Sequence, residues 1–193
     1  FMIQNYNIEK YINLKSYSES LGWIGYYGRK DNYSHLLMSE SIHQFISYFK
    51  EIVPEVSIIT SLYKFKTNNS RISTEQLELI KLGYLSNFTQ EYNDRDNENS
   101  RALKFFKDVK WDIVRKLSSI IMDNDGDIAG HCFIIFETLH LIIYPHDDTG
   151  YGFISSSKNI HSLQIINAFF NQLDTNKFLS QIKELKDYYR RIY

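Results

Sequence analysis

Apolar residues recur at helical spacing in several stretches of this chain. Ile42, Phe45, Ile46 and Phe49 form one stripe with polar residues between them, which predicts a helix that ends near Pro54. The same pattern predicts further helices over residues 4–20, 73–85, 100–121, 160–173 and 175–193.

Short β-branched and aromatic runs predict strands. Residues 131–137, 139–145 and 151–155 are such runs. Residues 56–65 are a fourth, although Ile58, Ile59 and Leu62 also fit a helix. The first two runs are apolar at successive positions, so apolar side chains point to both faces of the sheet. We therefore expect these two strands to lie in the middle of a sheet whose faces are both covered.

We place a turn at Glu137 and Thr138, so that Phe136 faces Leu139 across a hairpin. Glu-Thr suits a two-residue turn poorly, so a longer loop is the alternative. This register puts Ile134, Phe136, Leu139 and Leu141 on one face, and Phe133, Ile135, His140 and Ile142 on the other.

These patterns predict an α+β fold. A small antiparallel sheet, formed largely by residues 131–155, packs against several amphipathic helices. We expect one domain over residues 2–193, with a separate N-terminal helical lobe at residues 2–55 as the alternative.

Composition narrows the class of protein. The chain has 193 residues, of which 43% are hydrophobic and 23% charged, as in ordinary globular proteins. No apolar run reaches the roughly 18 residues that a membrane helix needs. The residues after Met2 do not resemble a signal peptide, and a single cysteine cannot form an intrachain disulfide, so we expect a cytoplasmic protein.

Charge is unevenly distributed. The net charge of −1 argues against broad nucleic-acid binding, which normally requires a basic excess. Between Lys116 and Lys158 there is no Lys or Arg, whereas six acidic residues lie there. This acidic segment predicts either a docking face for a basic partner or simply a solvated surface.

The first acidic turn, Asp123 to Asp127, resembles the opening of an EF-hand calcium loop. The rest of that motif is missing, because Ile128 stands where the loop needs Gly and Ile134 where it needs Glu. We expect a polar turn here, with Asp125 at its centre.

Four residues are of the types that bind zinc, namely His131, Cys132, His140 and His146. Their spacing, however, does not fit a zinc site. His131 and Cys132 are adjacent and point to opposite faces of a strand, and no C-x-x-C or H-x-x-x-H pair is present. We expect Cys132 to be a small buried hydrophobic residue and expect no structural metal.

The second acidic turn is His146, Asp147 and Asp148. Pro145 ends the preceding strand, and Gly150 permits a tight return. Two carboxylates and an imidazole at the end of a strand suit either a docking turn or an acid–base or metal site.

The segment from Leu141 to Ile154, LIIYPHDDTGYGFI, resembles the strand, Asp-Asp-x-Gly turn and strand module of small bacterial α+β proteins. Several of those proteins are similar to immunity proteins encoded beside secreted antibacterial toxins, including contact-dependent growth inhibition systems. The resemblance covers about 25 residues in the region 130–155 and transfers no functional residue by motif. It implies a cytoplasmic inhibitor that binds a toxin domain and blocks its active site.

Three hypotheses follow. The first is a toxin-neutralising protein whose partner is a toxin domain, such as a basic nuclease, and which binds neither nucleic acid nor membrane directly. The second is a metal-dependent hydrolase or nuclease-like enzyme that uses His146, Asp147 and Asp148. The third is a regulatory interaction module that docks through residues 23–27.

The first hypothesis expects no catalytic residue, no cofactor and no bound metal, and leaves open whether the chain is a monomer or a homodimer. Its partner-binding residues are Asp123, Asp125, Asp127, His146, Asp147, Asp148 and Tyr151.

Overall fold

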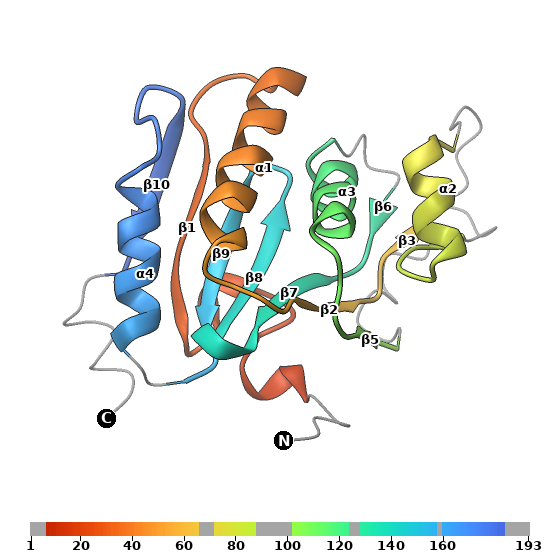
Figure 1. Cartoon of the computed structure of the whole chain (residues 1–193), viewed down its shortest axis with the longest axis horizontal. Helices are drawn as coiled ribbons and strands as arrows, with labels where there is room; N and C mark the ends of the chain where they lie inside the picture. The colour runs from red at the N-terminus through yellow and green to blue at the C-terminus, as the bar shows by residue number, and fades with distance from the viewer. Residues whose placement is uncertain (1–6, 66–71, 88–101, 124–127, 158–159, 184–193) are drawn as a thin grey trace.

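A computed structural model describes residues 7–65, 72–87, 102–123, 128–157 and 160–183. Its centre is a seven-stranded antiparallel sheet, shown in Figure 1. In spatial order the strands are β10 (Phe178–Ile182), β1 (Trp23–Arg29), β9 (Gly150–Ser155), β8 (Leu141–His146), β7 (Cys132–Phe136), β2 (Ser57–Thr60) and β5 (Lys104–Phe106).

Helices cover one face of this sheet (Figure 1). A second, three-stranded sheet lies beside β2 and β7, with the order β4 (Ser86–Asn87), β3 (Tyr63–Lys64) and β6 (Ile128–Ala129). The helices are α1 (His35–Lys50), α2 (Thr74–Lys81), α3 (Trp111–Met122) and α4 (Ile160–Phe170).

Local sequence explains where two helices begin. The Ser34 side chain accepts a hydrogen bond from the Leu37 backbone N–H at 3.1 Å and caps α1. Ser73 and Gln76 form a reciprocal capping box at the start of α2, and Gly83, at φ +83°, lies just beyond its end. None of the described helices is long and apolar enough to cross a bilayer.

The α+β class is confirmed, but the expectation of a small sheet was wrong. Strands β7, β8 and β9 lie where the sequence predicts them, and four more strands from distant parts of the chain extend the sheet. Both faces of β7 and β8 are covered, as expected for central strands. Ile134 and Ile143 face the helices, whereas Phe133 and Ile142 face the opposite side.

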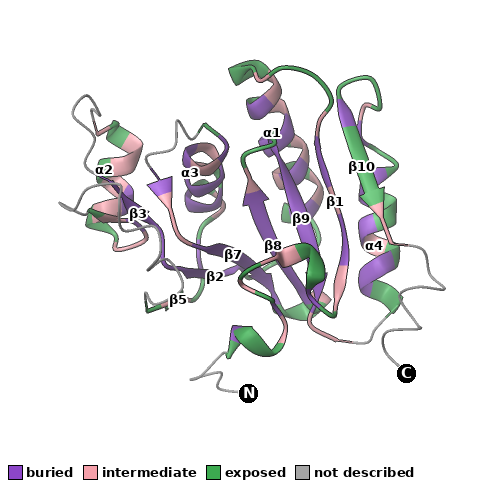
Figure 2. Ribbon diagram, turned by 180° about the vertical axis from the view of Figure 1, so that it is seen from behind, coloured by how far each residue is buried: buried purple, intermediate pink, exposed green. Residues whose placement is uncertain are grey.

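The segment from Asn7 to Ser20 covers that opposite face (Figure 2). We expected a helix here, but the described part holds two 3₁₀ turns, η1 (Ile8–Lys10) and η2 (Tyr17–Glu19). Asn13 and Ser20 explain the difference. The Asn13 side chain accepts from the Lys15 backbone N–H, and the Ser20 hydroxyl accepts from the Asn13 backbone N–H, so local bonds replace helical ones.

The expected helix over residues 100–121 starts later than predicted. Lys104–Phe106 pairs with β2 as an edge strand, and Asp108 has φ 53°. An α-helix cannot continue through a left-handed residue, so α3 begins only at Trp111.

The expected helix over residues 175–193 was also wrong in its described part. Residues 178–182 form β10 and pair with β1, and residues 184–193 lie outside the described part of the chain. Phe178 and Ile182 are four positions apart, which suits one side of a helix and equally one face of a strand.

The turn between β7 and β8 is the longer alternative and not the two-residue turn. Phe136 pairs with Leu141, and the turn η4 (Glu137–Leu139) is followed by His140 at φ 52°. The pairing differs from the predicted one by two residues, which is why the predicted faces of the flanking strands are nevertheless right.

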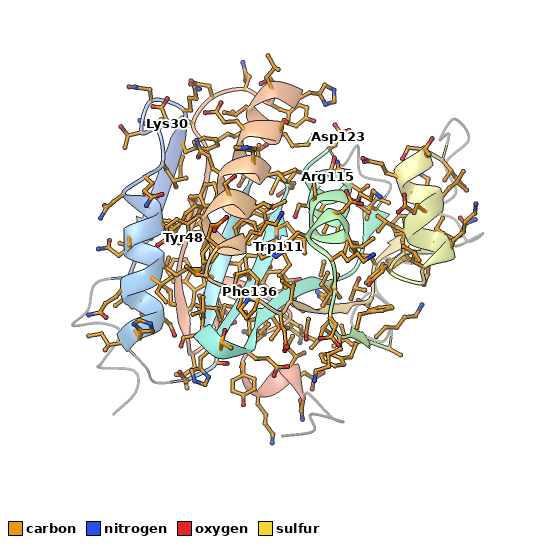
Figure 3. All side chains as sticks on the ribbon, viewed as in Figure 1. Lys30, Tyr48, Trp111, Arg115, Asp123 and Phe136 are labelled. Carbon is orange, nitrogen blue, oxygen red and sulfur yellow. The ribbon has the colours of Figure 1, made fainter. Side chains whose placement is uncertain are left out.

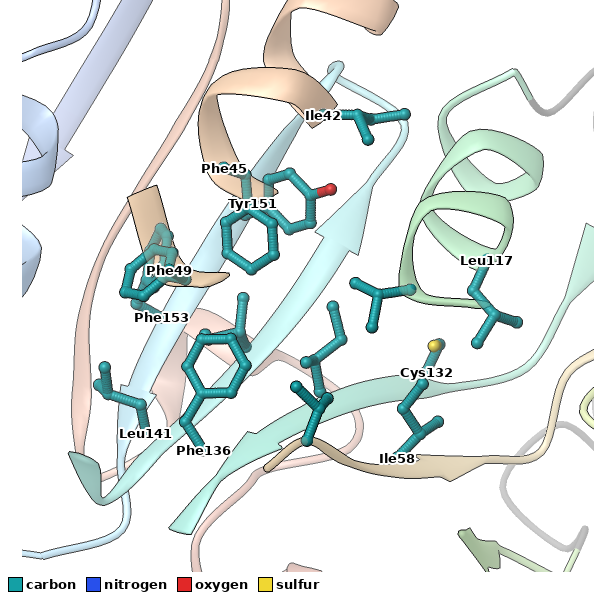
Figure 4. Packing of buried hydrophobic residues seen from close by; sticks show 14 of the residues in the cluster. Ile42, Phe45, Phe49, Ile58, Leu117, Cys132, Phe136, Leu141, Tyr151 and Phe153 are labelled. Atoms are coloured by element: carbon teal, nitrogen blue, oxygen red, sulfur yellow. The ribbon is translucent and has the colours of Figure 1, made fainter. Parts of the chain in front are cut away.

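Aromatic side chains fill the space between the helices and the sheet, as Figure 4 shows around Phe45. The Phe45 ring stacks on Tyr151 with centroids 3.9 Å apart, and Phe49 and Phe136 lie beside it. This cluster joins α1 to β7 and β9.

We expect Phe45→Ala to lower the free energy of unfolding by about 3–5 kcal/mol, because it leaves a cavity in a close-packed core. Leu36→Ala, at a side chain 84% exposed on the same helix, is the matched control and should change it by less than about 0.5 kcal/mol. Urea unfolding followed by circular dichroism measures both. Equal losses in the two variants would contradict a central role for Phe45.

Candidate functional site

The candidate functional site is the tip of the hairpin formed by β8 and β9, where potentially reactive side chains are concentrated. Pairing runs to His146 and Gly150, which leaves Asp147, Asp148 and Thr149 as a three-residue loop. Thr149 has φ 60°, the left-handed conformation that such loops use at their last position. Both Asp side chains are exposed and point into solvent.

Strand β1 holds this tip in place. The Arg29 backbone N–H donates to the Asp148 carbonyl at 2.8 Å. A Cβ atom at Gly150 would lie 1.9 Å from the Tyr27 carbonyl oxygen, so only glycine permits this approach of the two backbones. The two carboxylates are therefore presented from a fixed backbone.

The His146 ring is oriented by the same strand. Its Nε2 lies 3.0 Å from the Tyr27 carbonyl oxygen and must carry the hydrogen, because a carbonyl only accepts. The Tyr26 ring contacts it edge-on with centroids 5.8 Å apart. Burial lowers the pKa of His146, against the opposing effect of Asp148 and Asp147, so the ring is neutral at pH 7 and its Nδ1 carries a free lone pair.

Three ligand atoms thus converge at the tip. One atom each from His146, Asp147 and Asp148 lies within 4.8 Å of the other two. A histidine that donates its second N–H to a backbone carbonyl is the usual orientation of a metal ligand. The tip can offer one nitrogen and two oxygens to a divalent cation, with water completing the coordination.

Asp123 belongs to a different cluster, at the C-terminal end of α3 beside the start of α1 (Figure 3). The Tyr33 hydroxyl donates to its carboxylate at 2.5 Å, and His35 Nδ1 lies 3.5 Å from the same oxygen. Asp125 and Asp127 lie outside the described residues. Of the three expected aspartates that the structure describes, Asp147 and Asp148 lie together and Asp123 lies apart from them.

Tyr151 is a core residue, which corrects its place in the expected binding set. Its side chain is 0% exposed, because residues 151 and 153 of β9 face the helices. Burial also raises the pKa of its hydroxyl well above the ordinary value. It cannot contact a partner in this conformation.

Residues 23–27, the docking segment of the third hypothesis, are also internal. They form most of β1, which lies between β10 and β9, and both Ile24 and Tyr27 are fully buried. The large exposed apolar patch that this hypothesis needs is not formed by these residues.

Cys132 is a buried hydrophobic residue, as predicted. It lies between β7 and α3 (Figure 4), and burial raises the pKa of its thiol to about 12. Such a thiol is not a nucleophile at neutral pH.

Sequence reasoning missed the partner of His131. The Tyr17 hydroxyl lies 2.5 Å from His131 Nδ1, and this contact fixes the N-terminal segment on the sheet. Burial lowers the pKa of His131, so this ring too is neutral at pH 7. The two residues are 114 positions apart, and no local pattern marks the pair.

A cavity of about 450 Å³ lies between α1 and α4, away from the acidic tip. It contains His43 and Ser47, whose Nε2 and Oγ atoms are 3.5 Å apart on the exposed side of α1. This contact joins residues i and i+4 of one helix, which is a common arrangement on solvated helix surfaces.

Known proteins offer no guide to the function of this site. No family model, no curated protein and no solved structure matches the chain.

The lowered pKa values of His131 and His146 predict a pH dependence of stability. The unfolded chain takes up protons at the ordinary histidine pKa of about 6.5, before the folded chain does. The free energy of unfolding should therefore fall as the pH drops below about 6.5 and level off below the folded pKa values. Each pKa unit of lowering corresponds to about 1.4 kcal/mol.

Urea unfolding between pH 7.5 and pH 5 tests this expectation. His146→Gln keeps an N–H donor for the Tyr27 carbonyl but removes the titrating group, so it should flatten the curve. His43→Gln, at an exposed position of α1, should leave the curve unchanged. A curve that is equally steep in all three proteins would show that His146 does not cause it.

Proposed function

We propose that the chain is an immunity protein that binds a bacterial toxin domain and blocks its active site with an acidic surface. The observation that carries this proposal is the pair of exposed carboxylates on a fixed hairpin tip. Asp147 and Asp148 form no ion pair with any described residue, so their charge is directed at solvent. The resemblance of residues 141–154 to immunity proteins agrees with this function.

A rigid acidic tip suits rapid binding of a basic protein. Complementary charge raises association rates, and a nuclease active site that must attract nucleic acid is basic. A fixed backbone also reduces the entropy lost when the two surfaces meet. The strands that carry the tip are buried on both faces, which supplies that rigidity.

We expect the double charge reversal Asp147→Lys with Asp148→Lys to slow association with the toxin domain by about tenfold or more at low salt. Arg29 bonds the backbone carbonyl of Asp148, so the substitutions leave the anchor of the tip intact. The toxin domain would be the product of a neighbouring gene, and surface-based kinetics at several salt concentrations gives the rate.

Glu55→Lys is the matched control. Glu55 is exposed in the loop after α1, at the end of that helix remote from the tip (Figure 1). It should leave the association rate within about twofold. If the double variant binds at the wild-type rate with the wild-type salt dependence, the two aspartates are not in the interface. If the chain does not rescue the growth of bacteria that express the toxin domain, the proposed function is wrong.

The convergence of His146 with the two carboxylates favours a second function, metal-dependent hydrolysis. A divalent cation at the tip would polarise a substrate oxygen and lower the pKa of a bound water. The residues of this chain would hold the ion at the end of β8, in the open position that catalysis requires.

For this second function we expect one equivalent of Zn²⁺ or Mn²⁺ to bind in isothermal titration calorimetry. His146→Gln should weaken that binding by roughly tenfold or more, because glutamine lacks an equivalent of the imidazole Nδ1. His43→Gln is the control and should bind as the wild type does. A protein that binds neither ion, or that binds but cleaves no phosphodiester such as bis(4-nitrophenyl) phosphate, would be inconsistent with such an enzyme.

A further inference from the structure

A cavity of about 200 Å³ opens beside the acidic tip, where β7 and β8 separate. The ladder between the two strands ends at the pair Ile134 and Ile143. In the same register Cys132 would face Pro145, but proline has no backbone N–H to continue the ladder. Strand β8 runs on beside β9 alone, and Figure 4 shows β7 turning away from it.

The walls of this cavity combine apolar side chains with polar surface. Its mouth lies at the exposed Asp147 and the half-buried His146, and the Tyr17 side chain forms a further wall. The apolar lining residues are Leu62, Ile121, Ile128, Cys132 and Pro145.

Negative charge at the mouth has no positive counterpart among the lining residues. None of the described residues around the cavity is Lys or Arg. Lys64, which faces Ile128 in the adjacent ladder, is buried and does not line the cavity. The mouth therefore carries the single negative charge of Asp147.

We infer that this cavity receives an arginine side chain of the partner protein, with its alkyl stem against the apolar walls and its guanidinium at Asp147. This inference rests on the proposed function, because it names the group of the toxin domain that the chain would bind. Charge complementarity and shape both support it.

The chemistry favours arginine in particular. Its apolar stem packs on hydrophobic surface while the charged head stays at the rim. The planar guanidinium pairs with a carboxylate and stacks on an aromatic ring, here those of Asp147 and Tyr17. A cavity of about 150 Å³ accommodates benzene, so about 200 Å³ can hold the seven non-hydrogen atoms beyond the arginine Cα. A buried arginine that fills a pocket is a frequent hot spot of protein interfaces.

The cavity can be tested without the partner by using n-butylguanidinium as the probe. In a titration followed by ¹⁵N–¹H NMR, the amide signals of Gly130 and Cys132 should shift and saturate, because both residues line the cavity. Its neutral isostere n-butylurea should bind more weakly, by up to about fivefold, since an ion pair with a carboxylate near a protein surface contributes up to about this factor. Equal binding of both probes, or shifts that never saturate, would overturn the inference.

Two variants separate the contribution of the cavity shape to probe binding from that of the Asp147 charge. Asp147→Asn keeps the cavity open and should reduce n-butylguanidinium affinity to that of n-butylurea. Ala129→Phe, at a lining residue, should fill the cavity and abolish the binding of both probes. If Ala129→Phe does not fold, as its NMR spectrum would show, Asp147→Asn alone decides between a cation pocket and none.

Experiments with the toxin domain then distinguish this inference from the proposed function. Folded Ala129→Phe should raise the Kd for the toxin domain by more than tenfold, and Glu55→Lys should not. If Ala129→Phe neutralises the toxin as well as the wild type does, the cavity is not an anchor for the partner. The proposed function would still hold. Saturable n-butylguanidinium binding by a chain that neutralises no toxin would reject the function and leave the cation pocket standing.

Discussion

Burial of β7 and β8 on both faces is the constraint on which the rest of the structure depends. A strand with apolar side chains on both faces must be shielded from water on both faces. Different parts of the chain cover the two faces. Helices α1, α3 and α4 supply one layer. The segment with η1 and η2 supplies the other, and Ile8, Ile12 and Tyr17 form its apolar contacts. The N-terminal segment is thus part of the core in spite of its irregular backbone.

The same strands create the candidate site by separating. Pro145 cannot extend the ladder to β7, so β8 continues with β9 towards the tip and leaves the cavity behind it. Strand β1 then fixes the tip through the Tyr27 carbonyl and the Arg29 N–H. One hairpin therefore forms both buried strands of the sheet and the exposed acidic tip. The hairpin passes from the buried part to the exposed part at Pro145.

Sequence patterns predicted what is local in this fold and missed what is distant. The strands from Cys132 to Ser155 are contiguous, so their patterns and even their faces were predicted despite a wrong turn. Strand β10 was missed because the spacing of Phe178 and Ile182 suits a helix as well as a strand, and only pairing with β1 decides between them. Strand β5 likewise depends on its distant partner β2. Tertiary pairing overrides local preference in both cases.

The candidate site shows the same division. His146, Asp147 and Asp148 are adjacent in sequence, so their convergence was predictable, whereas the support from Tyr27 lies 119 residues away and was not. Tyr151 was wrongly predicted to contact a partner. Side chains alternate along a strand, and this alternation places Tyr151 on the face that the helices cover. Exposure at a strand end depends on which layers cover the strand, and that information is not in the local pattern.

The acidic tip cannot serve both proposed functions at once. With His146 neutral, the two carboxylates give the tip a charge of −2, which attracts a basic protein. A divalent cation held by the same atoms would bring that charge to zero and occupy Asp147, the residue at the mouth of the cavity. Cation binding and toxin binding must therefore oppose one another, and by linkage each would weaken the other by the same factor. A tip that evolved to bind a basic partner would favour weak cation affinity, whereas a hydrolase would require strong affinity. The sign of the coupling follows from the charges alone.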